Sequence, residues 1–436
     1  MLNSAILWNY FHRFLGVMAG RVVGALAIFG VNILIARNLG AEALGTYAIF
    51  VALVAIFALC LSIGFNSTAS VFAAEYKTTG KKSLFKGYIQ TSLKYIFFSS
   101  AFLLIALLAT WILAPQMLAD KKLIFAFLVI ITALGAAILN LNSAISVGLG
   151  RQVTGLLPET LIRPLLIGIA LFLIINRLSD IYWVMALSAA ATWLALIMAY
   201  FSVARRINSY KPISPQYDLN RWKKASRPWL ATSLLWDYMI DLVLIMTSLM
   251  AGAVEIAILH VSFRYRVLAG FGMRTIYLLL MPEISKSSID GNKQKLHQKI
   301  AQANWASLIY SLATILLFAV FGNWLLALFS AEFTSGLPVM IIILLTMLIR
   351  AIFGPAALVL AVNNLHLATA TISLLGLVVT MAIILVFFAQ FSLLAVAIAY
   401  SASNLMVSVL LWIHAKNKTG IDCSIFASRP IAKRIA

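Results

Sequence analysis

Six arginines stand inside long apolar segments of this 436-residue chain, and their guanidinium groups are the side chains best suited to bind a ligand. A charged side chain inside a bilayer costs roughly 2.5–3.5 kcal/mol on insertion scales, so each is expected to face protein or water. A guanidinium stays charged and binds phosphate or carboxylate in bidentate geometry. The pattern predicts a binding site for an anionic ligand, built from Arg21, Arg163, Arg264, Arg266, Arg274 and Arg350.

Three of these arginines lie on one predicted helix. At about 100° per residue, Arg264 and Arg266 point about 160° apart, and Arg274 falls between them in projection. The helix is then positive around nearly half of its circumference, and we expect it to border an aqueous cavity. Arg274 also lies near a predicted helix end, where snorkelling to the membrane interface is the alternative.

One carboxylate, Glu159, shares an apolar segment with an arginine. Glu159 precedes Arg163 by four residues, which is the favourable order for a helical ion pair. Pro158 and Pro164 are expected to kink the segment around this pair. We interpret the pair first as a structural one and second as a site for a coupling ion.

Two aspartates, Asp237 and Asp241, share a face of another predicted helix at the same spacing. Like charges in a low dielectric disfavour double ionisation, so the pair would share one proton or hold a cation. Neutralisation of one aspartate by an arginine is an equal alternative. The predicted candidates for ion coupling, by H+ or Na+, are therefore Asp237, Asp241 and Glu159.

The short motifs of enzymes are absent from the sequence. It contains no motif of ATP hydrolysis, dinucleotide binding, zinc proteolysis or serine hydrolysis. The five histidines are scattered without metal-ligand spacing, and Cys60 and Cys423 form neither a disulfide framework nor a metal site. We therefore predict no catalytic residue, no metal site and no resident cofactor, and expect that the chain is not an enzyme.

The elements that carry these residues must be membrane-spanning helices. The chain is 63% hydrophobic and 11% charged, with a mean hydropathy of +1.00, whereas charged residues make up about a quarter of soluble domains. A helical crossing takes about 20 residues, and the apolar runs are too long and continuous for barrel strands. The predicted fold class is an all-α polytopic membrane protein with about 12 transmembrane helices, at 14–36, 43–73, 89–113, 122–148, 156–175, 181–204, 229–250, 254–280, 300–329, 337–362, 365–388 and 393–414.

Lysine and arginine collect on one side of the predicted membrane, as cytoplasmic connectors do. Roughly 22 of them fall on the side of the two termini, against four on the other side: Arg37, Lys121, Lys122 and Arg177. Both termini are therefore predicted to be cytoplasmic. Topology accounts for most of the net charge of +20, so no nucleic-acid partner is predicted.

A polar stretch with basic residues and prolines divides the chain into two halves. The predicted organisation is an N-terminal lobe over 1–204, a basic cytoplasmic linker over 205–228, a C-terminal lobe over 229–414 and a cytoplasmic tail over 415–436. An even number of helices in each lobe would make the two lobes a parallel repeat. We expect a positively charged, water-accessible chamber between them.

Two short signatures resemble those of a known family. The first lies between the first two predicted helices and reads Ile35-Ala36-Arg37-Asn38-Leu39-Gly40, followed by Glu42, Gly45 and Tyr47. It resembles the AR-x-LG-x-x-x-x-G-x-Y signature of Wzx-type polysaccharide flippases, which belong to the multidrug/oligosaccharidyl-lipid/polysaccharide (MOP) exporter superfamily. The second, at 281–286, is similar to the Pro-x-x-Ser-Lys end of their eighth helix.

The resemblance implies a flippase of the bacterial inner membrane with two V-shaped, MATE-like lobes. Its substrate would be an undecaprenyl-diphosphate-linked oligosaccharide, such as the repeat unit of O-antigen lipopolysaccharide or capsule. Alternating access, driven by an ion gradient, would carry this substrate to the periplasmic leaflet, and the arginines would bind the diphosphate or acidic sugars. The implied partners are this substrate, membrane lipids, a polysaccharide polymerase and a chain-length regulator.

The resemblance also implies a sodium site, with one departure. Related lipid II flippases bind sodium between their seventh and eleventh helices with carboxylates on both. Asp237 matches the first position. The predicted eleventh helix offers no acid, only the polar side chains of Asn364, Thr369, Thr371, Ser373 and Thr380.

Two other functions remain open. A cation-coupled multidrug exporter of the same superfamily would line its cavity with acids and aromatics, whereas arginines outnumber acids in these segments. An oligosaccharide polymerase or ligase that uses the same carrier would need room outside the membrane for its acceptor, and the predicted external connectors are short.

Overall fold

The computed structural model describes residues 4–117, 120–178, 180–207, 214–290, 293–363 and 365–427, and all regular structure in these ranges is helical. The chain forms two compact units, 1–234 and 235–436, and each is described by itself. The predicted all-α polytopic fold class is confirmed. The predicted bounds of the lobes, the linker and the tail stay predictions.

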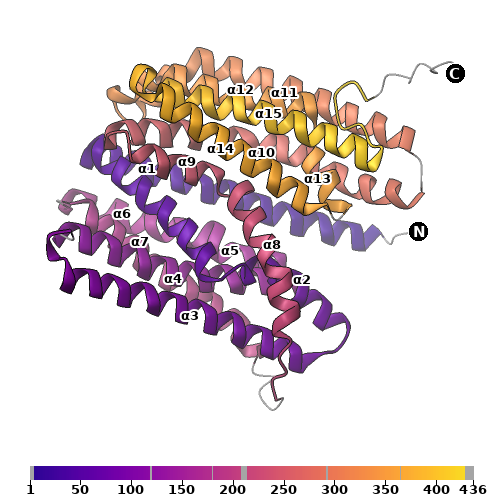
Figure 1. Ribbon diagram of the computed structural model, residues 1–436, viewed down its shortest axis with the longest axis horizontal. Helices are drawn as coiled ribbons and strands as arrows, with labels where there is room; N and C mark the ends of the chain where they lie inside the picture. The colour runs from indigo at the N-terminus through magenta and orange to yellow at the C-terminus, as the bar shows by residue number, and fades with distance from the viewer. Residues whose placement is uncertain are drawn as a thin grey trace. The chain divides into compact units, whose positions relative to one another are not determined.

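The first unit is built around one central helix. α4 (Asp120–Gly148) packs against α1 (Ser4–Leu61), α2 (Phe65–Thr78), α3 (Lys82–Leu113) and α7 (Ile181–Ile207) (Figure 1). Its apolar sequence is buried along most of its length, as the core position requires. Between α4 and α7 the chain forms α5 (Gln152–Leu157), the π-helix η2 (Pro158–Ile162) and α6 (Arg163–Ile174). Short 3₁₀ turns follow α3 and α6, at η1 (Pro115–Met117) and η3 (Ile175–Arg177).

The second unit packs its long helices side by side. α12 (Leu337–Phe353) contacts α10 (Ala253–Asp290), α11 (Lys293–Ala327) and α15 (Leu393–Thr419), and α15 also packs along α14 (His366–Phe391) (Figure 1). The shorter α9 (Met239–Ser248) lies against α10, and α13 (Ala356–Val362) lies against α15. The 3₁₀ helix η5 (Ala331–Gly336) leads into α12.

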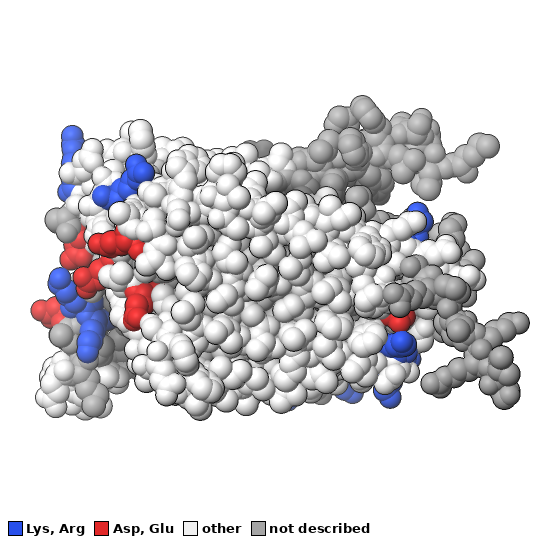
Figure 2. Space-filling model, turned by 90° about the horizontal axis from the view of Figure 1, so that it is seen from above, with Lys and Arg blue, Asp and Glu red and all other residues white. Residues whose placement is uncertain are grey.

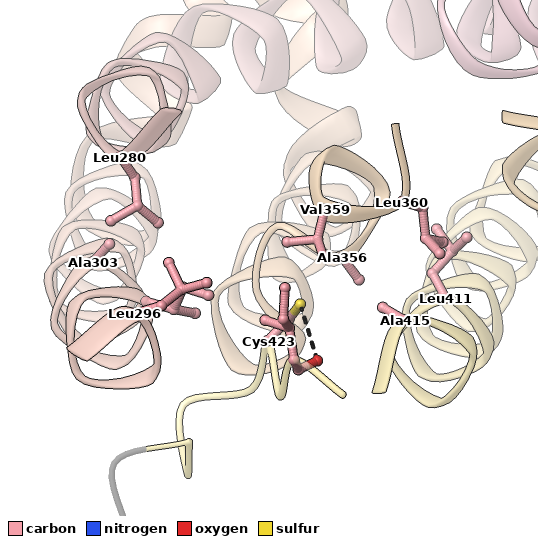
Figure 3. Close-up of a cluster of buried hydrophobic side chains, with 11 residues drawn as sticks. Leu280, Leu296, Ala303, Ala356, Val359, Leu360, Leu411, Ala415 and Cys423 are labelled. Carbon is pink, nitrogen blue, oxygen red and sulfur yellow. Dashed lines mark hydrogen bonds between the residues drawn. The ribbon is translucent and has the colours of Figure 1, made fainter. Parts of the chain in front are cut away.

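An apolar cluster at one end of the second unit holds the segment that follows α15. Cys423 and Ile421 of this segment are buried with Leu296, Val359 and Leu411, which come from α11, α13 and α15 (Figure 3). Gly354, between α12 and α13, has φ +70, and a Cβ there would lie 1.9 Å from the carbonyl oxygen of Cys423. Only glycine fits both the backbone conformation and the space.

Membrane-spanning character is evident from the helices themselves. Nine helices in the described ranges are long and apolar enough to cross a membrane, or ten if α8 (Leu219–Trp236) and α9, bent by 63°, form one span. α10, whose apolar sequence is interrupted by three arginines, is not among them. On the face shown in Figure 2, charged side chains gather at two ends and the band between them is uncharged. The chain is a multi-pass membrane protein, and the number of twelve crossings stays a prediction.

Three predicted helices are broken in the structure. The helix predicted over 43–73 is interrupted at Ile63 and Gly64, which have φ of 49 and 80. The helix predicted over 337–362 ends at Phe353 before Gly354, and the one predicted over 229–250 is interrupted between Trp236 and Met239. Each break falls inside a long, mostly apolar run, so hydropathy alone did not reveal it. The interruption between the first two predicted helices is found at Gly40, with φ 90.

The second half of the predicted linker is helical. α8 begins at Leu219 and buries Trp222 completely against α2 and α3. The indole Nε1 donates to the Tyr76 hydroxyl at 2.7 Å, and Arg221 makes two 2.8 Å bonds to the Glu75 carboxylate. Residues 219–228 of the predicted basic linker therefore form the start of α8, and the large side chain of Trp222 packs on the first unit.

Candidate functional site

The first group of predicted site residues depends on a close approach between α1 and η2. A Cβ at Gly24 would lie 1.7 Å from the carbonyl oxygen of Thr160, so only glycine permits this distance. Arg21 lies one helical turn before Gly24 and therefore on the same side of α1. The prolines at 158 and 164 lack the amide hydrogens that a regular α-helix would use, and the π-helix lies between them.

Glu159 on η2 is the acid of this first group. The positive charges of Arg163 and Arg21 both act on its carboxylate. With its amide turned to satisfy its neighbours, Asn140 of α4 donates to the two carboxylate oxygens at 3.1 and 3.3 Å. The structure thus brings Arg21, Glu159 and Arg163 together, with two cations around one acid.

The second group lies in the second unit, along α10. Arg264 Nε donates to His260 Nε2 at 3.3 Å, which requires that this imidazole nitrogen carry no proton. The charge of Arg264 also acts on Asp241, in the first turn of α9. His260 is buried, and both Arg264 and Asp241 are half-buried. Arg264 therefore has an acid nearby.

Arg266, two residues further along α10, is held by neutral groups. Its Nε donates to Thr346 Oγ1 of α12 at 2.8 Å, and its guanidinium lies 5.7 Å from the ring centroid of Tyr400 on α15. A hydroxyl and an aromatic ring orient a guanidinium without neutralising its charge. The side chain is half-buried, so that charge is kept in a partly dehydrated place.

Arg350 on α12 completes this group. Its guanidinium lies 5.3 Å from the ring of Trp236, and the positive charges of Arg266 and Arg274 act on it. The other groups that act on Arg350 are the hydroxyls of Tyr400 and Tyr277, and no carboxylate is among them. Arg266 and Arg274 therefore both lie within electrostatic range of Arg350. Arg266 and Arg350 have hydroxyl and aromatic partners, whereas Arg274 is exposed.

The predicted aspartate pair does not share a helix face. Asp237 is exposed in the break between α8 and α9, whereas Asp241 lies inside α9. The prediction of one continuous helix face is wrong because the chain turns by 63° between them. Their role in ion coupling stays a prediction.

The polar positions of the predicted eleventh helix lie on α14, except Asn364, which is outside the described residues. The hydroxyls of Thr369 and Ser373 are buried and have no hydrogen-bond partner within the described chain. In the same ranges, no three histidine, cysteine or acidic side chains come close enough to hold a metal ion.

Several contributors to these groups carried no sequence signal. Asn140, Thr346 and Trp236 are uncharged and follow no motif that would have marked them as site residues. Their roles depend on which helices become neighbours, which hydropathy does not encode. The second sequence signature, at 281–286, lies in α10, in a stretch whose side chains are outside the described part.

Comparison with known proteins places the fold. No protein-family model and no curated protein matches the sequence. Solved structures do match. An inward-facing multidrug resistance MATE family transporter of the MOP superfamily superimposes with a TM-score of 0.72 at 15% identity, covering 92% of this chain and 98% of that one.

Two further solved structures match the fold of this chain. An outward-facing multidrug resistance MATE transporter gives a TM-score of 0.64 at 14% identity, over 94% of this chain and 95% of that one. A MOP superfamily transporter from Pyrococcus furiosus Vc1, described as having a binding pocket of reverse polarity, gives 0.65 at 15% identity over 94% and 95%. The chain therefore has the MATE-like fold of MOP superfamily transporters.

Proposed function

We propose that this protein is a Wzx-type flippase that moves an undecaprenyl-diphosphate-linked oligosaccharide from the cytoplasmic to the periplasmic leaflet of a bacterial inner membrane. It works by alternating access, without covalent chemistry, and an ion gradient supplies the energy. Both termini lie in the cytoplasm. The repeat unit belongs to O-antigen lipopolysaccharide or capsule and is passed on to a polymerase with its chain-length regulator.

One observation carries the proposal: the positive charges of Arg266 and Arg274 both act on Arg350 in the second unit, and among the described residues no carboxylate is found to act on Arg350. Mutual repulsion inside a membrane protein is costly, and an anion that visits the site relieves it. A diphosphate offers two charged groups with the geometry that guanidinium binds in bidentate fashion. Arg21 and Arg163 supply a second positive group in the first unit.

The proposal is tested by deletion and complementation. Deleting the gene should cause carrier-linked repeat units to accumulate in the cytoplasmic leaflet and should remove surface polysaccharide. Wild-type protein should restore both, whereas Arg266→Gln and Arg350→Gln, inserted at wild-type levels, should not. Arg177→Gln changes an exposed arginine in η3 and serves as the matched control. Normal surface polysaccharide in the deletion strain would refute the proposal.

A cation-coupled multidrug exporter is the second candidate, because two of the matched structures are multidrug resistance transporters. In that case the carboxylates would couple ion movement to drug export, so Asp241→Asn or Glu159→Gln would abolish the drug resistance that overexpression confers. Arg266→Gln and Arg350→Gln would then leave resistance intact. The arginine variants therefore distinguish the two candidates, because they abolish transport by the flippase and spare the drug exporter.

A further inference from the structure

A small pocket in the first unit is lined by residues that belong to neither arginine group. It occupies about 180 Å³ where α3 and α8 meet the turn that precedes α2. Phe65 and Tyr95, stacked with their ring centroids 5.2 Å apart, form an aromatic side of the pocket, and Ile63, Lys223 and Arg227 complete it. The pocket therefore combines an aromatic wall with two cations.

Lys223 and Arg227 lie side by side, and among the described residues no acidic side chain pairs with either of them. Lys223 and Arg227 are four residues apart on α8, so they share one face of the helix. The ammonium of Lys223 lies 5.7 Å from the ring of Tyr95. Among the described residues neither cation forms a salt bridge, whereas Arg221 on the same helix is bound to Glu75. The pocket offers positive charge to an outside group.

The backbone of this pocket is strained at one position. Ile63 has φ 49, a left-handed conformation that a β-branched residue rarely adopts. The next residue, Gly64, is packed so closely on α8 that a Cβ would lie 2.4 Å from the carbonyl oxygen of Ser226. Such strain persists where surrounding structure enforces it, and it is common at binding sites. Here the docking of α8 enforces the turn and also presents the two cations.

A shallow, open apolar groove runs along one face of α3. It holds about 570 Å³ and is lined by Gln90, Leu93, Lys94, Phe97, Phe98 and Ala101. Lys94 at the groove and Tyr95 at the pocket are consecutive residues of α3, so the groove and the pocket lie at the same level of the helix, about 100° apart around its axis. Phe97 and Phe98 are exposed. A molecule with an anionic head and a hydrocarbon chain would match this order of charge and apolar surface.

We propose that this pocket binds the headgroup phosphate of an anionic phospholipid and that the groove on α3 receives one of its acyl chains. The pocket holds about 180 Å³, less than the about 300–1,000 Å³ of a site for a drug-sized ligand, so it has room for a headgroup and not for a whole lipid or oligosaccharide. The lipid would hold α8 against α3 by bridging the two helices. This lipid site is separate from the proposed transport function and does not depend on it.

The test measures binding of short-chain phosphatidylglycerol to the purified, delipidated full-length protein in detergent. Each basic residue near an anionic headgroup contributes roughly fivefold to affinity, so K223Q/R227Q should bind about 30-fold more weakly than wild type. K224Q changes the adjacent, exposed lysine and should stay within about twofold. If both variants lose the same affinity for phosphatidylglycerol, or if K223Q/R227Q loses none, the pocket is not the headgroup site.

A second variant separates a lipid from a free anion. A101W fills the apolar groove and leaves both cations in place, so it should weaken phosphatidylglycerol binding at least about tenfold without unfolding the protein. Inorganic phosphate, used as the competing probe, should bind far more weakly than the lipid. The proposal of a lipid occupant is overturned if inorganic phosphate binds as tightly as phosphatidylglycerol and if A101W changes the binding of neither.

Discussion

The carboxylate of Asp422 is expected to clamp the segment after α15 onto the second unit, and Asp422→Asn should loosen it. The carboxylate accepts hydrogen bonds from Trp412 Nε1 at 2.9 Å, Lys416 Nζ at 3.0 Å, and the Ser424 amide and hydroxyl at 3.0 and 2.8 Å. The Asp422 amide in turn donates to His297 Nε2 at 3.1 Å. An asparagine cannot pair with Lys416 and cannot accept all of these bonds at once.

The magnitude follows from the pKa of Asp422. Burial alone would raise this pKa, but the hydrogen bonds from Trp412, Ser424 and Lys416 outweigh burial and lower it from 3.8 to about 2. Two pKa units correspond to about 2.5 kcal/mol. The side chain is 20% exposed, so solvent screening reduces the expected contribution to about 1–2 kcal/mol.

The pH dependence has a definite sign. Because the folded pKa lies below the unfolded one, the carboxylate stabilises the docked segment fully above about pH 5. The contribution falls to about half near pH 3 and is nearly lost by about pH 2, as the folded form also takes up the proton. Asp422→Asn should therefore matter most at neutral pH.

Hydrogen exchange of residues 420–427, measured by mass spectrometry in detergent, tests this. At pH 7 the variant should lose about 5–30-fold in protection, and the difference should shrink at pH 3. Asp180→Asn, which removes the exposed ion pair with Lys121, should leave protection of 420–427 unchanged. Equal protection in wild type and Asp422→Asn at pH 7, or an undiminished difference at pH 3, would contradict the reasoning.

Two further predictions concern the packing of the first unit. Gly24→Ala should destabilise the protein by about 1–3 kcal/mol, because the new Cβ must displace the Thr160 carbonyl. Gly30→Ala, which has open space at its Cβ, should leave the stability unchanged. Thermal unfolding of both variants in detergent measures the difference. Trp222→Ala should cost about 3–5 kcal/mol and expose α8 to proteolysis, whereas Trp222→Phe should lose less, since it keeps the ring and gives up only the bond to Tyr76.

Hydropathy predicted the long helices because their apolar runs match the thickness of a bilayer. α4 is predicted over 122–148 and found at Asp120–Gly148, and α15 is predicted from residue 393 and begins there. Two interruptions were predicted from glycine or proline, whereas those at Gly64 and Gly354 were not, although glycine stands at both. The break at Gly40 separates two predicted helices, and the prolines at 158 and 164 flank the predicted distortion that proves to be a π-helix.

Tertiary contacts explain what the sequence did not predict. The turn at Ile63 has a residue of high strand propensity in a left-handed conformation, which local preference opposes and which the docking of α8 imposes. The segment 219–228 is polar on average, and its single fully buried tryptophan decides where it packs. Tyr47 of the family-like signature bonds to Ser188 at 3.0 Å, so this position has a structural role in joining α1 to α7.

The partners of Arg266 and Arg350 in the second unit differ from those of Arg21 and Arg163 in the first unit, and this difference bears on the cargo. In the first unit Glu159 lies between two arginines and offsets part of their charge. In the second unit Arg266 and Arg350 are oriented by Thr346, Tyr400 and Trp236, which leave the charge in place. A cationic drug near these side chains would add to their mutual repulsion, whereas a diphosphate would relieve it without any rearrangement of protein acids. The second unit is therefore where an anionic headgroup gains most, and substitution of Arg266 or Arg350 should impair transport more than substitution of Arg163.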